Sequence, residues 1–149
     1  GLAREHVACL KDRYQLPEPR LGLGEALCGV ASAAADVSDG LLSDAGHIAS
    51  ASGVRIELEA AAVPLSVAAA AWVAAAPDAR RANCATLGDD YELVFTAPPG
   101  AAGRVEDAAR KAGVGVSRIG TVVEGEGAVL LDASGRPVAV KRAGWNHGA

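Results

Sequence analysis

The sequence predicts an α/β protein in which helices cover a mixed sheet. Residues Val54–Glu59 alternate between apolar and polar side chains, as in a strand with one buried face. Residues Leu41–Ser52 instead repeat their apolar side chains at helical spacing, and Gly53 follows as a C-terminal cap. Near the end of the chain, Val129–Leu131 and Val138–Val140 flank a turn-rich stretch, which predicts a hairpin. Helix-linked strands followed by a hairpin together favour a mixed sheet.

The other elements are predicted in chain order from the same periodicities. Helices are expected over 2–14, 25–29, 67–75 and 101–112. Strands are expected over 33–35, where small residues predict a buried strand, from about residue 91, and over 116–123. Ser66 is a suitable N-cap for the third of these helices. Residues 78–85 are expected to be irregular, with Arg80 and Arg81 as a solvated basic pair.

Composition limits the classes of protein to consider. The 149 residues fit one domain, and 50% hydrophobic content with only 3% aromatic residues predicts a core of Ala, Val and Leu. A net charge of -4 gives no general attraction for nucleic acid. No apolar run approaches the length of a membrane span and no signal pattern is present, so we expect a soluble, cytoplasmic protein. Cys9, Cys28 and Cys84 lack metal-site or disulfide-framework spacing and are expected to be buried free thiols.

The stretch Asp36–Gly40 joins a predicted strand to a predicted helix. Asp36 and Asp39 can direct oxygens at one point, which suits Mg2+, and Ser38 lies between them. The alternative is that Ser38 or Asp39 only caps the helix and Asp36 is a turn residue. Asp44 and His47 are expected to be a polar pair on the solvent side of the helix, and Asp44 is the weaker metal candidate because it lies beyond the first turn.

Three further positions are candidates for ligand contacts. Asp89 lies in a second acidic stretch at the mouth of a predicted strand, where acids are also common as solvated turn residues. Trp145 can stack on an aromatic or cationic ligand, or can pin the end of the chain to the core. Arg20 can face a phosphate, although a surface arginine near a loop often has no specific role.

Three motifs together resemble one family of enzymes. Asp36–Leu41, Val63–Ser66 and Gly88–Thr96, in this order and spacing, resemble the C-terminal half of the thiamine-monophosphate kinases. That family belongs to the aminoimidazole ribonucleotide synthetase superfamily. The resemblance extends from about Pro19 to Trp145 and implies the layered α/β domain that forms the C-terminal half of these proteins.

The resemblance also implies an activity and roles for individual residues. It implies ATP-dependent phosphorylation of thiamine monophosphate to thiamine diphosphate. We assign no general base, because a phosphate monoester oxygen is already a competent nucleophile near neutral pH. Asp36 and Asp39 would ligate Mg2+, Ser38 would touch the nucleotide, and Asp89 and Trp145 would contact the substrate. The family has Glu at the position of Asp89, so the shorter side chain here changes the substrate geometry. No Walker-type phosphate-binding motif occurs, which excludes a P-loop kinase.

The resemblance further implies that residues 1–18 are a helix and linker from a missing N-terminal domain, and that 19–149 form the C-terminal domain. The full-length protein would be a homodimer that binds ATP and thiamine monophosphate. Because the N-terminal half of the family supplies most of the metal-binding aspartates, we expect this chain alone to be inactive and to bind nucleotide weakly.

Two other functions remain open from the sequence. One is another ATP-using member of the superfamily, such as a selenophosphate synthetase or a hydrogenase-maturation protein. The other is a non-enzymatic module that binds a phosphate ligand or a partner chain.

Overall fold

The computed structural model describes residues 1–140, except for the side chain of Asp78. The helices are α1 (Arg4–Gln15), α2 (Leu21–Ala26), α3 (Leu41–Ser52), α4 (Val67–Val73), α5 (Pro77–Thr86) and α6 (Ala102–Ala112), with short 3-10 helices η1 (Ala60–Ala62) and η2 (Pro99–Ala101). The strands are β1 (Ala33–Asp36), β2 (Arg55–Glu59), β3 (Leu93–Thr96), β4 (Gly120–Val123) and β5 (Gly127–Leu131).

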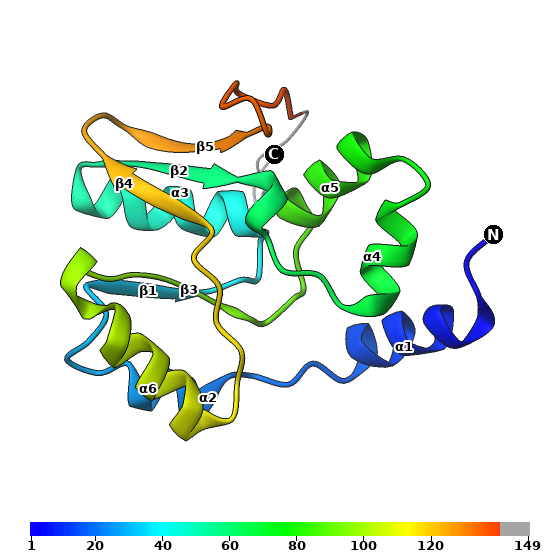
Figure 1. Ribbon diagram of the computed structural model, residues 1–149, viewed down its shortest axis with the longest axis horizontal. Helices are drawn as coiled ribbons and strands as arrows, with labels where there is room; N and C mark the ends of the chain where they lie inside the picture. Colours follow the sequence, from blue (N-terminus) through cyan, green and yellow to red (C-terminus); the bar gives the residue numbers. More distant parts are fainter. Residues whose placement is uncertain (141–149) are drawn as a thin grey trace.

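The strands form two sheets with α3 between them (Figure 1). One sheet is the antiparallel pair β1–β3, in which Ala33 lies opposite Thr96 and Asp36 opposite Leu93. The other has the order β4-β2-β5, and it is mixed because β2 runs antiparallel to β4 and parallel to β5. Helices α2 and α6 pack together on the far side of β1–β3. The predicted α/β class is therefore confirmed, with the strands divided between two sheets.

The core is built from small and aliphatic residues, as the composition predicts. Leu58 on β2 and Leu130 on β5 are only 2% and 1% exposed, and both belong to the cluster beneath α3. Ala45 and Ala49 have no exposed surface, so α3 approaches the strands through side chains of minimal size. A smaller cluster around Leu23 joins α2 to α6 and to the β1–β3 pair.

The segments with the clearest periodicity fold as predicted. Helix α3 ends at Gly53, whose φ of 63° is left-handed. Helix α4 begins at Ser66, whose Oγ accepts the N–H of Ala69 at 3.1 Å. The predicted strand over 33–35 is present as part of β1, but it is only partly buried because Ala34 is exposed.

The prediction for residues 78–85 is wrong, because these residues lie in α5. Proline occupies the start of this helix, where its missing N–H costs nothing. Arg80 and Arg81 are half-buried and not simply solvated. The guanidinium of Arg80 lies 4.9 Å from the centre of the Trp72 ring, and Nη1 of Arg81 donates to the carbonyl of Ala60 at 2.9 Å. These contacts hold a polar helix against α4 and η1.

Several smaller expectations are also corrected. The second helix is Leu21–Ala26 and not 25–29. After β5 the chain turns and Val138 donates its N–H to the carbonyl of Leu130, but 138–140 do not form a strand. The three cysteines are free, as predicted, but Cys9 and Cys28 are exposed and Cys84 is half-buried.

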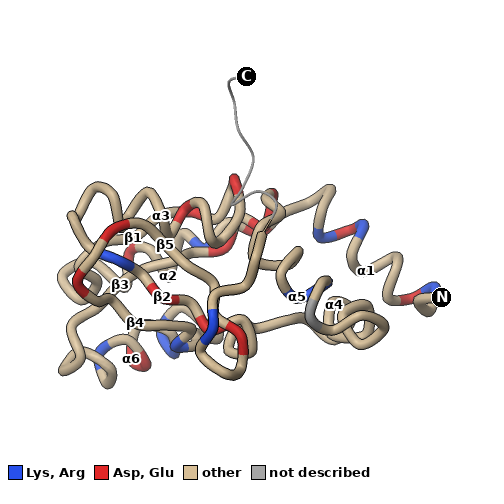
Figure 2. The backbone as a smooth tube through the Cα atoms, turned by 90° about the horizontal axis from the view of Figure 1, so that it is seen from above, with Lys and Arg blue, Asp and Glu red and all other residues tan. Residues whose placement is uncertain are grey.

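Two surface properties follow from the described residues. Acidic and basic residues alternate along α1, which projects from the body of the structure and has no buried residue (Figure 2). Within residues 1–140, no helix has the length and apolar character needed to cross a membrane.

The central strand provides a test of the core. Leu58→Ala should lower the free energy of unfolding by about 2–5 kcal/mol, because the site lies between a sheet and a helix and cannot collapse fully. Urea denaturation measures this. The control is Val122→Ala on the edge strand β4, where the side chain is 44% exposed and the loss should stay below about 1 kcal/mol. Equal losses for the two variants would contradict the packing described here.

Candidate functional site

Two acidic loops lie against each other at one end of the β1–β3 pair. We call residues 36–40 the first acidic loop and residues 88–92 the second acidic loop. The N–H of Val37 donates to the carbonyl of Glu92 at 2.8 Å, and the N–H of Tyr91 donates to the carbonyl of Val37 at 2.9 Å. The N–H of Asp89 reaches the carbonyl of Ser38, also at 2.9 Å. Backbone pairing therefore continues beyond the strands and brings two motifs together that are about fifty residues apart.

Two glycines make this close approach possible. A Cβ atom on Gly88 would overlap the carbonyl oxygen of Ser38. A Cβ atom on Gly40 would lie 2.8 Å from the carbonyl oxygen of Thr86, and Gly40 also has a φ of 123°, which disfavours any other residue. Both loops thus need a glycine at the point where their backbones meet.

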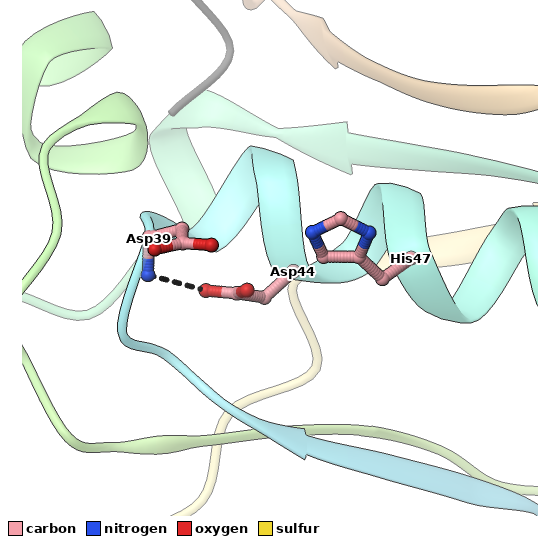
Figure 3. A group of neighbouring side chains, drawn as sticks. All are labelled: Asp39, Asp44 and His47. Carbon is pink, nitrogen blue, oxygen red and sulfur yellow. Dashed lines mark hydrogen bonds between the residues drawn. The ribbon is translucent and has the colours of Figure 1, made fainter. Parts of the chain in front are cut away.

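Asp44 organises the first acidic loop. The N-cap of α3 is Gly40, which has no side chain to accept the N–H groups at the helix start. Oδ2 of Asp44 accepts the N–H of Gly40 at 3.2 Å, together with those of the two loop residues before it, Ser38 at 3.0 Å and Asp39 at 3.1 Å. Figure 3 shows the bond from Asp39. Asp44 is only 5% exposed, so the prediction that it lies on the solvent side is wrong, whereas His47 is exposed as expected. The overlooked signal was an acid in the first turn of a helix whose cap is glycine.

Asp39 lies close enough to Asp44 and His47 of α3 for the three side chains to bind one metal ion. One ligand atom from each of Asp39, Asp44 and His47 lies within 4.8 Å of the others (Figure 3). The carboxylate oxygens suit a hard cation such as Mg2+, whereas an imidazole is more typical of transition metals. The group formed by Asp39 of the first acidic loop with Asp44 and His47 of α3 therefore has donors that fit a divalent metal ion.

Asp36 lies outside that group, exposed at the end of β1. It lines a pocket of about 280 Å³ together with Tyr91, Arg20 and residues from the start of α2. Asp89 and Tyr91 have left-handed φ values of 69° and 52°, which are uncommon for residues with side chains. Such backbone strain is frequent where side chains are held for binding. Trp145, the remaining candidate, lies outside the described residues.

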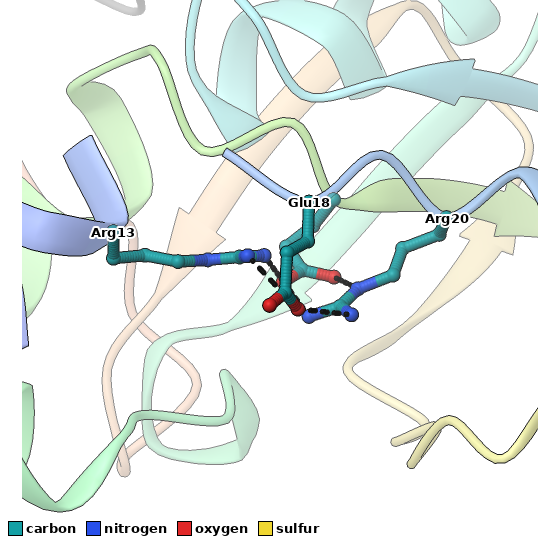
Figure 4. A network of polar contacts seen from close by, with 4 residues as sticks. Arg13, Glu18 and Arg20 are labelled. Atoms are coloured by element: carbon teal, nitrogen blue, oxygen red, sulfur yellow. Dashed lines mark hydrogen bonds and ion pairs between the residues drawn. The ribbon is translucent and has the colours of Figure 1, made fainter. Parts of the chain in front are cut away.

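An ion-pair network ties the N-terminal helix to the second acidic loop (Figure 4). Arg20 binds Glu92 with two hydrogen bonds of 2.8 Å, and Nη2 of Arg13 donates to the same carboxylate at 2.8 Å. Glu18 lies 3.3 Å from each arginine. Arg20 is a candidate from the sequence for facing a phosphate, but here its guanidinium binds the carboxylate of Glu92. The hydrogen bond from Arg20 lowers the pKa of Glu92, and the same bond raises the pKa of Arg20.

Asp90, an exposed residue next to this network, has a carboxyl group with a raised pKa. Partial loss of solvent around its carboxyl and then the negative charge of Glu92 raise its pKa to about 6, although Arg13 acts in the opposite direction. A carboxyl whose pKa rises on folding binds more protons in the folded state between its two pKa values. Ionised Asp90 therefore destabilises the protein above about pH 6, and the penalty disappears as the pH falls toward 4.

Comparison with known proteins identifies the family. Residues 8–132 match the family model of the AIR synthase related protein, C-terminal domain. The chain belongs to this family. It is 49% identical over 138 residues to the thiamine-monophosphate kinase of Caulobacter vibrioides, a match that covers 91% of this chain and 39% of the relative. The enzyme of Haemophilus influenzae is 37% identical, over 93% of this chain and 42% of the relative. The chain thus spans about two fifths of the length of these relatives.

Solved structures show the same fold. The crystal structure of the thiamine-monophosphate kinase from Stenotrophomonas maltophilia K279a matches with a TM-score of 0.80 and 35% identity, over 93% of this chain and 42% of that chain. AaThiL complexed with AMPPCP and TMP matches with a TM-score of 0.75 and 29% identity, over 98% of this chain and 43% of that chain. The hydrogenase maturation protein HypE of E. coli, at 21% identity and a TM-score of 0.65, shares the fold.

The contact between the two acidic loops can be tested at Gly88. Gly88→Ala should destabilise the protein by about 3 kcal/mol, because the new methyl group collides with backbone atoms that cannot rotate away. Thermal and urea denaturation measure the loss. Gly103→Ala is the matched control, since a Cβ there meets nothing within 4 Å and replaces glycine in α6, which should stabilise by about 0.5 kcal/mol. A tolerated alanine at 88 would show that the loops are not held this closely.

The acidity of Asp90 can be tested by NMR titration of its carboxyl carbon. We expect a midpoint near pH 6, moving upward in Arg13→Gln because a compensating positive charge is lost. Arg110→Gln removes an arginine from α6 that pairs with Asp107, and it should leave the midpoint unchanged. Asp90→Asn should stabilise the protein at pH 7.5 by about 1 kcal/mol or less, since solvent screens this exposed group, and the gain should vanish near pH 4. A midpoint near 4 in the wild type would contradict this account.

Proposed function

We propose that the full-length protein is a kinase that uses ATP to phosphorylate thiamine monophosphate to thiamine diphosphate. The observation that carries the proposal is the 49% identity with a thiamine-monophosphate kinase across 91% of this chain. A structural neighbour that covers 98% of the chain is described as a complex with AMPPCP and TMP, which supports the same pair of ligands here. HypE shares the fold at 21% identity, so its likeness gives no support for a hydrogenase-maturation function.

The first acidic loop would hold the metal ion that accompanies the nucleotide. Asp36 and Asp39 are the proposed Mg2+ ligands, and Ser38 between them would touch the nucleotide. Asp36 ends β1 and Asp39 directly precedes the cap of α3, and the residues between them, Val37 and Ser38, pair with the backbone of residues 89–92. Bound Mg2+ would neutralise phosphate charge during transfer. The carboxylates would keep the metal, and therefore the phosphates, in one orientation.

The second acidic loop would position the phosphate acceptor. Asp89 is the proposed substrate contact, and its backbone is anchored to Ser38, so the acceptor and the nucleotide would lie on adjoining loops. Trp145 would supply an aromatic surface for the cationic thiazolium ring. No side chain is assigned as a general base, because a phosphate oxygen is already ionised near neutral pH and is a competent nucleophile.

The relatives are longer than this chain, so the proposal extends to an N-terminal domain. We propose that residues 1–18 connect an N-terminal domain to the domain formed by 19–149, which is consistent with relatives more than twice as long as this chain. The N-terminal domain would complete the metal site, and the full-length protein would act as a homodimer in the cytoplasm.

The full-length gene product tests the activity directly. With Mg2+ and ATP it should convert thiamine monophosphate to thiamine diphosphate, measured by chromatography, and it should leave aminoimidazole-pathway substrates unchanged. Asp36→Asn should weaken Mg2+-dependent ATP binding by about tenfold or more, because a neutral amide is a poor ligand for a hard cation. Asp107→Asn on α6 is the control, an exposed carboxylate remote from both loops, and should match the wild type.

Two results would contradict the proposal. One is a full-length protein that forms no thiamine diphosphate although it is folded and supplied with Mg2+ and ATP. The other is efficient turnover by the 149-residue chain alone, which would show that no N-terminal domain is needed.

A further inference from the structure

The start of α3 is a place where an anion would normally bind. The first N–H groups of a helix have no partner within the helix, and together with the helix dipole they attract phosphate. In α3 the N-cap N–H of Gly40 and the two N–H groups before it converge on one point, and the chain itself fills that point. Oδ2 of Asp44 accepts the N–H groups of Ser38, Asp39 and Gly40 at 3.0–3.2 Å.

An incoming phosphate would have to displace a buried carboxylate. Asp44 is 5% exposed, and its side chain is held by three backbone N–H groups, those of Ser38, Asp39 and Gly40. A ligand atom of Asp44 also lies within 4.8 Å of one from Asp39. Two carboxylates therefore lie beside the N-terminus of α3, where the helix dipole alone would give a positive potential.

We propose that Asp44 is a positioning residue that makes phosphate binding at the first acidic loop depend on a metal ion. Its carboxylate occupies the point on which the N–H groups of residues 38–40 converge, directly before the helix, and it orients the backbone of Ser38 and Asp39. Its charge adds to the attraction of Asp39 for a cation. Phosphate then reaches this loop through the metal ion, and not through the backbone N–H groups. This inference rests on the proposed nucleotide function.

A residue that only caps the helix would behave differently from one that also selects for metal. Loss of a simple cap loosens the loop and weakens every form of nucleotide binding. Loss of a carboxylate that blocks the anion position weakens binding with the metal, but it strengthens binding without the metal, because three N–H groups are released and a negative charge is removed. The sign of the metal-free effect separates the two roles.

The experiment uses calorimetric titration of the full-length protein with ATP, once with Mg2+ and once with EDTA. Asp44→Ala should bind ATP about tenfold more weakly with Mg2+ and about threefold more tightly in EDTA. Asp44→Asn retains an oxygen that can accept the three N–H groups but has no charge. It should lose affinity with Mg2+ and gain none in EDTA. Asp107→Ala removes an exposed carboxylate of α6 and should match the wild type in both titrations.

Hydrogen exchange provides a readout that is independent of nucleotide. The amides of residues 38–40 should exchange slowly in the wild type and in Asp44→Asn, and at least tenfold faster in Asp44→Ala. Fast exchange in the wild type would overturn the inference.

The titrations distinguish a failure of this inference from a failure of the proposed function. Wild-type protein that binds no ATP even with Mg2+ would overturn the proposed function and this inference with it. Wild-type binding combined with weaker binding of Asp44→Ala in both titrations would overturn the inference alone. If circular dichroism shows Asp44→Ala unfolded, Asp44→Asn decides, and an unchanged affinity with Mg2+ in that variant overturns the inference.

Discussion

The close contact between the backbones of residues 38–40 and 86–88 governs the rest of the site. Gly40 and Gly88 are glycines because a Cβ atom on either would press against a backbone carbonyl. A glycine at the N-cap, however, removes the side chain that most helices use to satisfy their first N–H groups. The carboxylate of Asp44, from within the helix, instead accepts the N–H of Gly40 and those of the two residues before it. The acid buried one turn into α3 thus holds the loop that lies against residues 86–88.

Charge is balanced separately in the two loops. In the first acidic loop, backbone N–H groups surround Asp44, and Asp39 lies beside it. In the second, Arg13 and Arg20 neutralise Glu92. Those arginines come from α1 and the segment that follows it, so a carboxylate of the second acidic loop helps to hold the N-terminal helix, which also contacts α4.

Sequence periodicity predicted the elements that are stabilised by their own buried face. Helix α3 and strand β2 carry their apolar residues at regular spacing, and both form as expected. Helix α5 was missed because it is mostly polar: of its described side chains only Ala82 and Ala85 join it to the main core, and Arg80 and Arg81 add contacts with Trp72 and Ala60. The division of the strands into two sheets was also not predictable, because it depends on which strands pair and not on their local pattern.

The same distinction applies to the site. Asp36, Asp39 and Asp89 were predicted because their motifs resemble those of a known family, and the structure brings their loops together. The role of Asp44 was not predicted, although an acid in the first turn was a signal for it, because the sequence offered Ser38 or Asp39 as the cap and the structure has Gly40 there. Restoring a capping side chain at position 40 would not make Asp44 dispensable, because serine there would collide with Thr86 and separate the two loops. Gly40, Gly88 and Asp44 therefore depend on one another. The two glycines let the backbones meet, Asp44 binds the loop, and a substitution at one of these positions is not compensated by a substitution at another.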